Sequence, residues 1–255
     1  MVDVSGPSAG RFSVGRVFSR TFAVLRGEAV SLAVLTALLG FLPTFLFGLL
    51  RVTGVVPDPG EDLSAAFRGA PGERVAVAVT DTFLLGSALS VTLAAAAGRR
   101  LSVSEALSGA TQHFWRLLGI NILVGLATLV GLLLLIVPGV WIYLRWMVAP
   151  AAQIAEAQGV TESMARAAQL SEGHRWALFG AIVVGLLVVV LLALAINAPL
   201  AVFEPGTYAA LLAVNLVGDP LSAALGGLLF AVGLGAAYEE LRTAREGSQV
   251  AEVFG

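Results

Sequence analysis

Six stretches of this 255-residue chain are long and apolar enough to be read as helices that cross a lipid bilayer. A spanning helix needs about 20 mostly apolar residues, with a range of about 17–25. The fourth stretch fits least well, because Arg145 and Pro150 interrupt it. We therefore predict an all-α integral membrane protein with six transmembrane helices. These stretches cover residues 29–50, 75–97, 117–137, 140–155, 176–196 and 221–238.

The composition supports this class and argues against several functions. Hydrophobic residues make up 58% of the chain and charged residues 13%, whereas soluble domains carry about 25% charged residues. The net charge of −2 gives no basic surface for nucleic acid. Cysteine is absent, and the two histidines lie far apart, so we expect no metal site and no cofactor. No serine lies in a nucleophile motif, and we expect the protein not to be an enzyme.

Arginine supplies all fifteen basic residues, a usage that fits a GC-rich bacterial genome. Positive residues in short loops mark the cytoplasmic side of a membrane protein. With the N-terminus inside, the cytoplasmic segments hold eleven arginines, and the outer segments hold only Arg51, Arg68 and Arg74. We therefore predict a multi-pass protein of the bacterial inner membrane with both termini in the cytoplasm. No cleavage site is evident, so the N-terminus is expected to be retained.

A short amphipathic segment leads into the first, third and fifth apolar stretches, beginning at Ser13, Ser102 and Gly159. Each segment has apolar residues at helical spacing, and such a helix can lie in the plane of the lipid headgroups. Ser102 and Glu105 also fit a capping box. We therefore expect three parallel repeats, each an interfacial helix followed by a helical hairpin. They form one membrane domain over residues 1–255, with repeats at roughly 12–98, 101–157 and 159–240 and a cytoplasmic tail at 241–255.

The three outer connections differ in character. The first is long and acidic, and the second is expected to be a tight turn at Pro138-Gly139. The third, at residues 197–220, is mostly apolar. The sequence leaves open whether this third connection is a re-entrant segment or an outer interfacial helix.

A pattern of motifs runs from residue 137 to residue 180. It combines Pro138-Gly139, an aromatic span that contains Arg145, a Glu-x-x-Gly turn at Glu156–Gly159, an amphipathic helix, and then Trp176 and Gly180. This pattern resembles the membrane domain attached to some bacterial glycerophosphoryl diester phosphodiesterases, and the stand-alone inner-membrane proteins that share it. In that family the hydrolase is a separate soluble barrel, for which this chain has no counterpart. The resemblance therefore implies a membrane module without the hydrolase.

Two ionisable residues fall inside the predicted spans. Asp81 lies in the second span and Arg145 in the fourth, both roughly 8–9 Å below the outer edge at 1.5 Å per residue. Ionisable groups within a membrane usually pair or line a cavity. We predict an intramembrane pair of Asp81 and Arg145, either structural or functional, with an Arg145 that reaches the headgroups as the alternative.

Six further residues are candidates for contact with lipid headgroups, because they open the third and fifth spans at the predicted cytoplasmic surface. Aromatic rings are common at this depth, so an ordinary interfacial belt is the alternative. The candidates are His113, Trp115, Arg116, His174, Arg175 and Trp176.

These features favour a non-enzymatic membrane module that binds or organises lipids, or that scaffolds a membrane or cytoplasmic protein. The alternative is a small transporter or lipid translocator that uses Asp81 and Arg145. An apolar groove between the interfacial helices would favour the binding module, and a wet cavity reaching Asp81 would favour the transporter. The ligand and the oligomeric state are not specified by the sequence.

Overall fold

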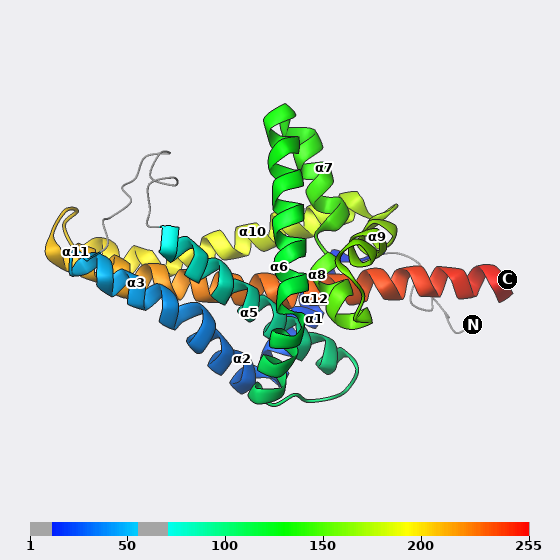
Figure 1. The fold of residues 1–255 in the computed structure, drawn as a ribbon, viewed down its shortest axis with the longest axis horizontal. Helices are drawn as coiled ribbons and strands as arrows, with labels where there is room; N and C mark the ends of the chain where they lie inside the picture. Colours follow the sequence, from blue (N-terminus) through cyan, green and yellow to red (C-terminus); the bar gives the residue numbers. More distant parts are fainter. Residues whose placement is uncertain (1–11, 56–70, 255) are drawn as a thin grey trace, which may run out of the picture.

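The computed structural model describes residues 12–55 and 71–254, and the regular structure in these ranges is helical (Figure 1). The prediction of an all-α protein is therefore confirmed. Its elements are α1 (Val14–Gly27), α2 (Ala29–Thr36), the π-helix η1 (Ala37–Phe41), α3 (Leu42–Val52), α5 (Pro71–Ala96), α6 (Val103–Leu134), α7 (Ile136–Trp146), α8 (Ala149–Glu156), α9 (Val160–Ser171), α10 (Arg175–Asn197), the 3₁₀-helix η2 (Ala198–Val202), α11 (Tyr208–Ala213), the π-helix η3 (Val214–Gly218) and α12 (Asp219–Phe254).

Five helical runs in the described chain are long and apolar enough to cross a membrane, which indicates a membrane protein. The fourth predicted span is not among them, because residues 140–155 divide between α7 and α8 at Met147-Val148. Pro150 lies in the first turn of α8. Proline has no N–H and its ring disrupts the preceding turn, so a helix cannot continue through it undisturbed. The five runs are Ala29–Val52, Gly72–Ala96, Val103–Leu134, Arg175–Val202 and Tyr208–Glu246.

Four of these runs lie side by side and alternate in direction: α2–η1–α3, α5, α10 and α11–η3–α12 (Figure 1). The last is central, because α12 packs against α1, α3, α5 and α10. At one end, the backbone N–H of Ser13 donates to Glu240 of α12. At the other end, Arg51 in the last turn of α3 pairs with Glu73 at the start of α5. Residues 197–220 do not form a separate element, because α10 continues into η2 and α11 continues through η3 into α12.

The hairpin of α6 and α7 crosses the direction of α10 and α12 and projects away from the bundle (Figure 1). Its turn is at Leu135, which is extended (φ −166°, ψ 150°), and not at the predicted Pro138-Gly139. Pro138 instead lies in the first turn of α7, where a missing N–H leaves no broken hydrogen bond. The two helices touch at glycine, because a Cβ on Gly131 would lie 2.7 Å from the Cα of Gly139.

The predicted threefold repeat is only partly visible in the described chain. The first and third units have a short helix, a break and then a long helix, with breaks at Glu28 and around Gly173 (φ +81°). The second unit differs, because α6 continues for 32 residues from its N-cap Ser102 without a bend. Nothing in α6 adopts a positive φ, and it contains no proline, so no residue forces a break. Three equivalent repeats are therefore not confirmed.

Candidate functional site

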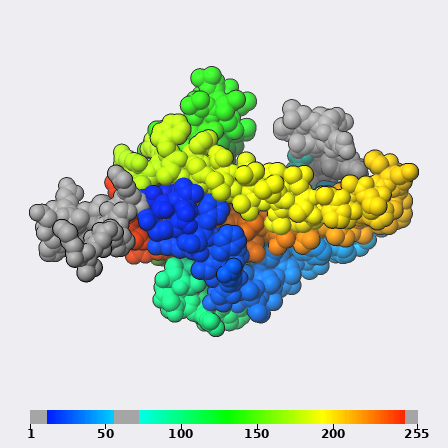
Figure 2. Space-filling view, turned by 180° about the vertical axis from the view of Figure 1, so that it is seen from behind, coloured from blue at the N-terminus to red at the C-terminus, as the bar shows by residue number. Residues whose placement is uncertain are grey.

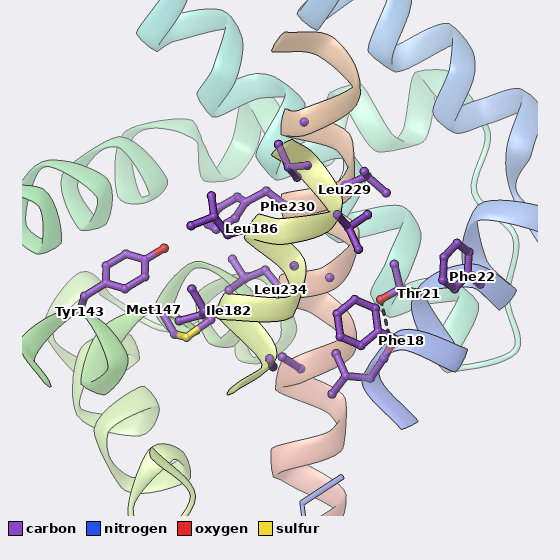
Figure 3. A pocket seen from close by; sticks show the side chains of 18 residues that line it. Phe18, Thr21, Phe22, Tyr143, Met147, Ile182, Leu186, Leu229, Phe230 and Leu234 are labelled. Atoms are coloured by element: carbon purple, nitrogen blue, oxygen red, sulfur yellow. Dashed lines mark hydrogen bonds between the residues drawn. The ribbon is translucent and has the colours of Figure 1, made fainter. Parts of the chain in front are cut away.

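A cavity of about 360 Å³ lies between α1, α7, α10 and α12 (Figure 3). Tyr143 of α7 and Met147, directly after it, approach the cavity from one side, and Phe18 and Phe22 of α1 from the other. We call this cavity the lateral groove. It is lined by Val17, Phe18, Thr21, Phe22, Tyr143, Met147, Ala181, Ile182, Gly185, Leu186, Val188, Val189, Gly226, Leu229, Phe230, Gly233, Leu234 and Ala237.

The lining of the lateral groove is almost wholly apolar. Only Thr21 and Tyr143 carry polar side-chain atoms. The Thr21 hydroxyl already donates to the Val17 carbonyl at 2.9 Å, within its own helix. The groove therefore offers hydrocarbon surface with one phenol, and it has no charged group with which to hold a polar solute.

Glycine creates much of the space. Gly185 of α10 and Gly233 of α12 both line the groove, and a Cβ on either would meet no atom within 4 Å. The amphipathic α1 closes one side, where it lies against α10 and α12 (Figure 2). The apolar face predicted for α1 thus contributes to the groove, although Phe22 stays 51% exposed. The rim is open to the surroundings of the protein.

A second cavity of about 370 Å³ lies on the side of α6 and α7. It shares Tyr143, Met147, Phe230 and Leu234 with the lateral groove, so the two cavities adjoin at these residues. Its lining includes Asn121 and Thr128 of α6. This second cavity is therefore somewhat more polar than the lateral groove, and α7 separates the two.

Ion pairs hold α1 beside the groove. Glu240 of α12 is 2% exposed, and its Oε1 accepts from Arg16 Nε at 2.6 Å and from the Ser13 backbone N–H at 3.3 Å. Its Oε2 lies 3.3 Å from a terminal nitrogen of Arg20. Glu240 is not among the site residues predicted from the sequence. The sequence feature that could have indicated its role is an acidic pair, Glu239-Glu240, at the end of an apolar span. The first helix, which is rich in arginine, could supply its partners.

A second carboxylate joins α8, α9 and α12. Glu156 accepts hydrogen bonds from Arg166 Nε at 2.8 Å, from the Tyr238 hydroxyl at 2.9 Å and from the Gln158 amide at 2.8 Å. The Glu-x-x-Gly turn therefore serves as an anchor for the helices around it. All its bonds are to groups of the protein, and nothing in this geometry leaves Glu156 free to act on a ligand.

The predicted pair of Asp81 and Arg145 is not present among the described residues. Asp81 is exposed on α5 and forms no ion pair there. Arg145 is exposed at the end of α7, with its guanidinium carbon 5.8 Å from the ring of Trp146. Neither residue lines either cavity. Asp81 and Arg145 were expected at the same depth because residues 140–155 were predicted to span the membrane. The break between α7 and α8 removes the basis for that expectation.

The three headgroup candidates of α6 divide into two kinds. His113 and Arg116 contact the protein: the His113 Nδ1 lies 2.8 Å from the amide nitrogen of buried Gln153, and Arg116 donates to the Ala157 carbonyl at 3.2 Å. Trp115 is 78% exposed. Trp115 and Arg116 are therefore both exposed, whereas His113 is half-buried.

The three candidates at the start of α10 are also unlike one another. The His174 ring lies 6.2 Å from the ring of Phe12, and Trp176 is 79% exposed. The Arg175 guanidinium lies over the ring of Trp141, 4.5 Å from its centroid. Arg175 thus connects α10 to α7.

In the part of the chain that the structure describes, no cluster of three His, Asp or Glu side chains could hold a metal ion. The site is an apolar one, built from helices of an all-α protein with five described runs long and apolar enough to cross a membrane. The chain belongs to the uncharacterised protein family UPF0259, whose family model matches residues 70–225. Neither the curated proteins nor the solved structures gave a match.

The family match extends from α5 into α12, so it includes α7 and α10 of the lateral groove but not α1. It shows no link to the glycerophosphoryl diester phosphodiesterases, and the resemblance to their membrane domain stays a prediction.

Proposed function

We propose that this protein is a non-enzymatic lipid-binding module of the bacterial inner membrane, and that the lateral groove holds an acyl chain of a membrane lipid. The observation that carries the proposal is the groove itself, with its volume of about 360 Å³ and its apolar lining. Small-molecule sites typically have volumes of about 300–1,000 Å³ and are mostly apolar, with a few polar groups. A hydrocarbon chain matches this lining, whereas a polar solute would lose its hydration without gaining partners.

The open rim supports a lipid that enters from the side. Leu186 is 61% exposed and Phe230 is 48% exposed, so the groove and the outer surface form one apolar face. A lipid chain could move from the bilayer into the groove without crossing a polar barrier. Once inside, it would gain dispersion contacts that an unfilled space between helices lacks.

The transporter alternative receives no comparable support. It requires a polar route to Asp81, but neither cavity is lined by Asp81 or by Arg145. The lateral groove is apolar and has one amphipathic helix, α1, on its wall, so it meets part of the criterion for a binding module; its other walls are α7, α10 and α12 rather than further amphipathic helices.

Filling the groove tests the proposal. Leucine at both Gly185 and Gly233 would occupy space that is empty in the structure, and native mass spectrometry would measure the lipid that stays bound. If about two methylenes of the lipid are displaced, at about 0.8 kcal/mol each, lipid occupancy should fall about tenfold. Gly180→Leu is the matched control, because Gly180 also lies on α10 with open space around it but does not line the groove.

The control variant should retain lipid at the level of the unchanged protein. Equal retention by the filled variant would show that the lipid binds elsewhere, and the proposed function would then be wrong.

A further inference from the structure

We propose that the groove selects an anionic phospholipid, and that Arg175, with Arg145 beside it, binds the phosphate of its headgroup. This inference rests on the proposed function, because it assigns the headgroup of the lipid whose chain lies in the groove. It is carried by two arginines that pair with no carboxylate among the described residues, by the tryptophans that they contact, and by the register of α10.

Arg175 is held in place, but no carboxylate in the described part of the chain pairs with it. Its guanidinium lies over Trp141, 4.5 Å from the ring centroid, and its Nε is buried with no hydrogen-bond partner within residues 12–55 and 71–254. A buried N–H without an acceptor costs free energy, so an added acceptor would stabilise this arrangement. Glu172, three residues earlier, is exposed and forms no ion pair with Arg175 among the described residues.

Arg145 brings a second positive charge to the same region. It also has no carboxylate partner in the described chain, unlike Arg166, whose Nε lies 2.8 Å from Glu156. The Ser171 hydroxyl donates to the Arg145 carbonyl at 3.2 Å, which fixes the end of α7 against the end of α9. Since Arg175 follows Ser171 by four residues and lies over Trp141, the two arginines come from adjoining helix ends.

The register of α10 connects this positive region to the groove. Arg175, Ile182 and Leu186 are spaced by seven and four residues, so they share one face of the helix. Ile182 and Leu186 line the groove. At 1.5 Å per residue, Arg175 lies about 10 Å along the helix from Ile182. A phospholipid with its phosphate at Arg175 could therefore direct an acyl chain along α10 into the groove.

The chemistry of the region favours an anion. A guanidinium presents paired N–H donors that match two oxygens of a phosphate, and such charge-assisted hydrogen bonds are strong. A zwitterionic headgroup would bring an ammonium group near two arginines, and no described carboxylate there pairs with either. The region therefore suits a phospholipid with net negative charge better than a zwitterionic one.

The test compares two lipids of equal chain length, phosphatidylglycerol and phosphatidylethanolamine, added to the delipidated protein in detergent and followed by native mass spectrometry. The unchanged protein should prefer phosphatidylglycerol by about tenfold, the ratio that about 1.4 kcal/mol gives. Arg175→Gln should lose most of this preference, and Arg145→Gln part of it. Arg175→Lys should be intermediate, since it keeps the charge but not the planar group. Arg26→Gln is the control, because Arg26 is an exposed arginine on α1 away from the groove lining.

The outcomes separate the headgroup assignment from the groove. If Arg175→Gln still binds phosphatidylethanolamine but has lost the preference, the variant is folded and the assignment holds. If it keeps the preference, or if Arg26→Gln loses it equally, the assignment is wrong while the groove proposal stands. If excess inorganic phosphate or glycerol phosphate displaces the lipid, the arginines bind free phosphate and the lipid assignment is overturned. If the unchanged protein retains neither lipid, the proposed function itself fails.

Discussion

Glu240 is a carboxylate that folding removes almost completely from solvent at the contact between α12 and α1. Its desolvation is offset by Arg16, Arg20 and the backbone N–H of Ser13. Breaking a buried ion pair typically costs about 3–5 kcal/mol, because the remaining charge is left without a partner. The cost here is smaller, since the side chains of Arg16 and Arg20 are 43% and 39% exposed and can be hydrated again. The residue therefore matters most for the position of α1.

We expect Glu240→Gln to weaken the attachment of α1 and to lower the free energy of unfolding by about 1–3 kcal/mol, the range for losing charged hydrogen bonds. Denaturant titration in detergent would measure this change. A single cysteine at Ser19 would report the exposure of α1, and the chain contains no other cysteine. Glu246→Gln is the control, because its pair with Arg242 is exposed and spaced i,i+4, which is typically worth about 0.3–0.5 kcal/mol. Equal effects of the two changes would show that Glu240 does not fix α1.

At the scale of elements, α6 is determined at its start by the capping box that the sequence predicted. The Ser102 hydroxyl accepts from the Glu105 backbone N–H at 3.3 Å, and Glu105 accepts from the Ser102 backbone N–H at 2.8 Å. The free N–H groups of Ser102 and Glu105 at the start of α6 are therefore satisfied, and the helix runs from there without interruption to Leu134.

Replacing the N-cap should loosen this first turn. Ser102→Ala removes the side-chain acceptor and should lower the free energy of unfolding by about 1 kcal/mol, the usual effect of losing a serine cap. Hydrogen exchange at the amides of the first turn would locate the change. Ser108→Ala, at an exposed position inside the same helix, should be neutral or slightly stabilising, because alanine has the higher helix propensity. A loss confined to Ser108→Ala would contradict the role of the cap.

At the scale of the whole molecule, the arrangement of the α6–α7 hairpin across the bundle sets the relation to the membrane. Its tip carries consecutive exposed apolar residues, with Leu133, Leu134, Leu135, Ile136 and Val137 each 69–78% exposed. Exposing this apolar surface to water would be energetically unfavourable. We therefore infer that the tip stays in lipid while the other long helices cross the bilayer, with Ser102 on the cytoplasmic side and Thr53 on the outer side.

Single-cysteine labelling with a membrane-impermeant maleimide checks this placement in intact cells and in inverted vesicles. A cysteine at Thr53 should react from outside, a cysteine at Ser102 from inside, and a cysteine at Leu135 from neither side. Reaction of the Leu135 site from outside would mean that α6 and α7 cross the membrane as a spanning hairpin. Reaction of Thr53 and Ser102 from the same side would overturn the orientation inferred from the arginines.

The class of the protein and the local features of its helices follow from the sequence alone. Long apolar stretches need no tertiary information, because a helix that satisfies its own backbone hydrogen bonds is the available structure in lipid. The capping box at Ser102 and the break before α10 are equally local. The apolar face of α1 was also evident from helical spacing, and it contributes Val17 and Thr21 to the buried interior.

The tertiary structure decided the features that depend on which helices meet. Residues 140–155 are apolar enough to suggest a span, but Pro150 and the packing of α8 divide them. Asp81 and Arg145 were paired by depth along separate helices, and depth does not specify neighbours. The lateral groove arises because Gly185 and Gly233, on different helices, face one space together with the aromatic face of α1. The sequence shows that a residue is glycine, but it does not show whether the absent side chain leaves a cavity. That depends on which helix packs opposite the glycine.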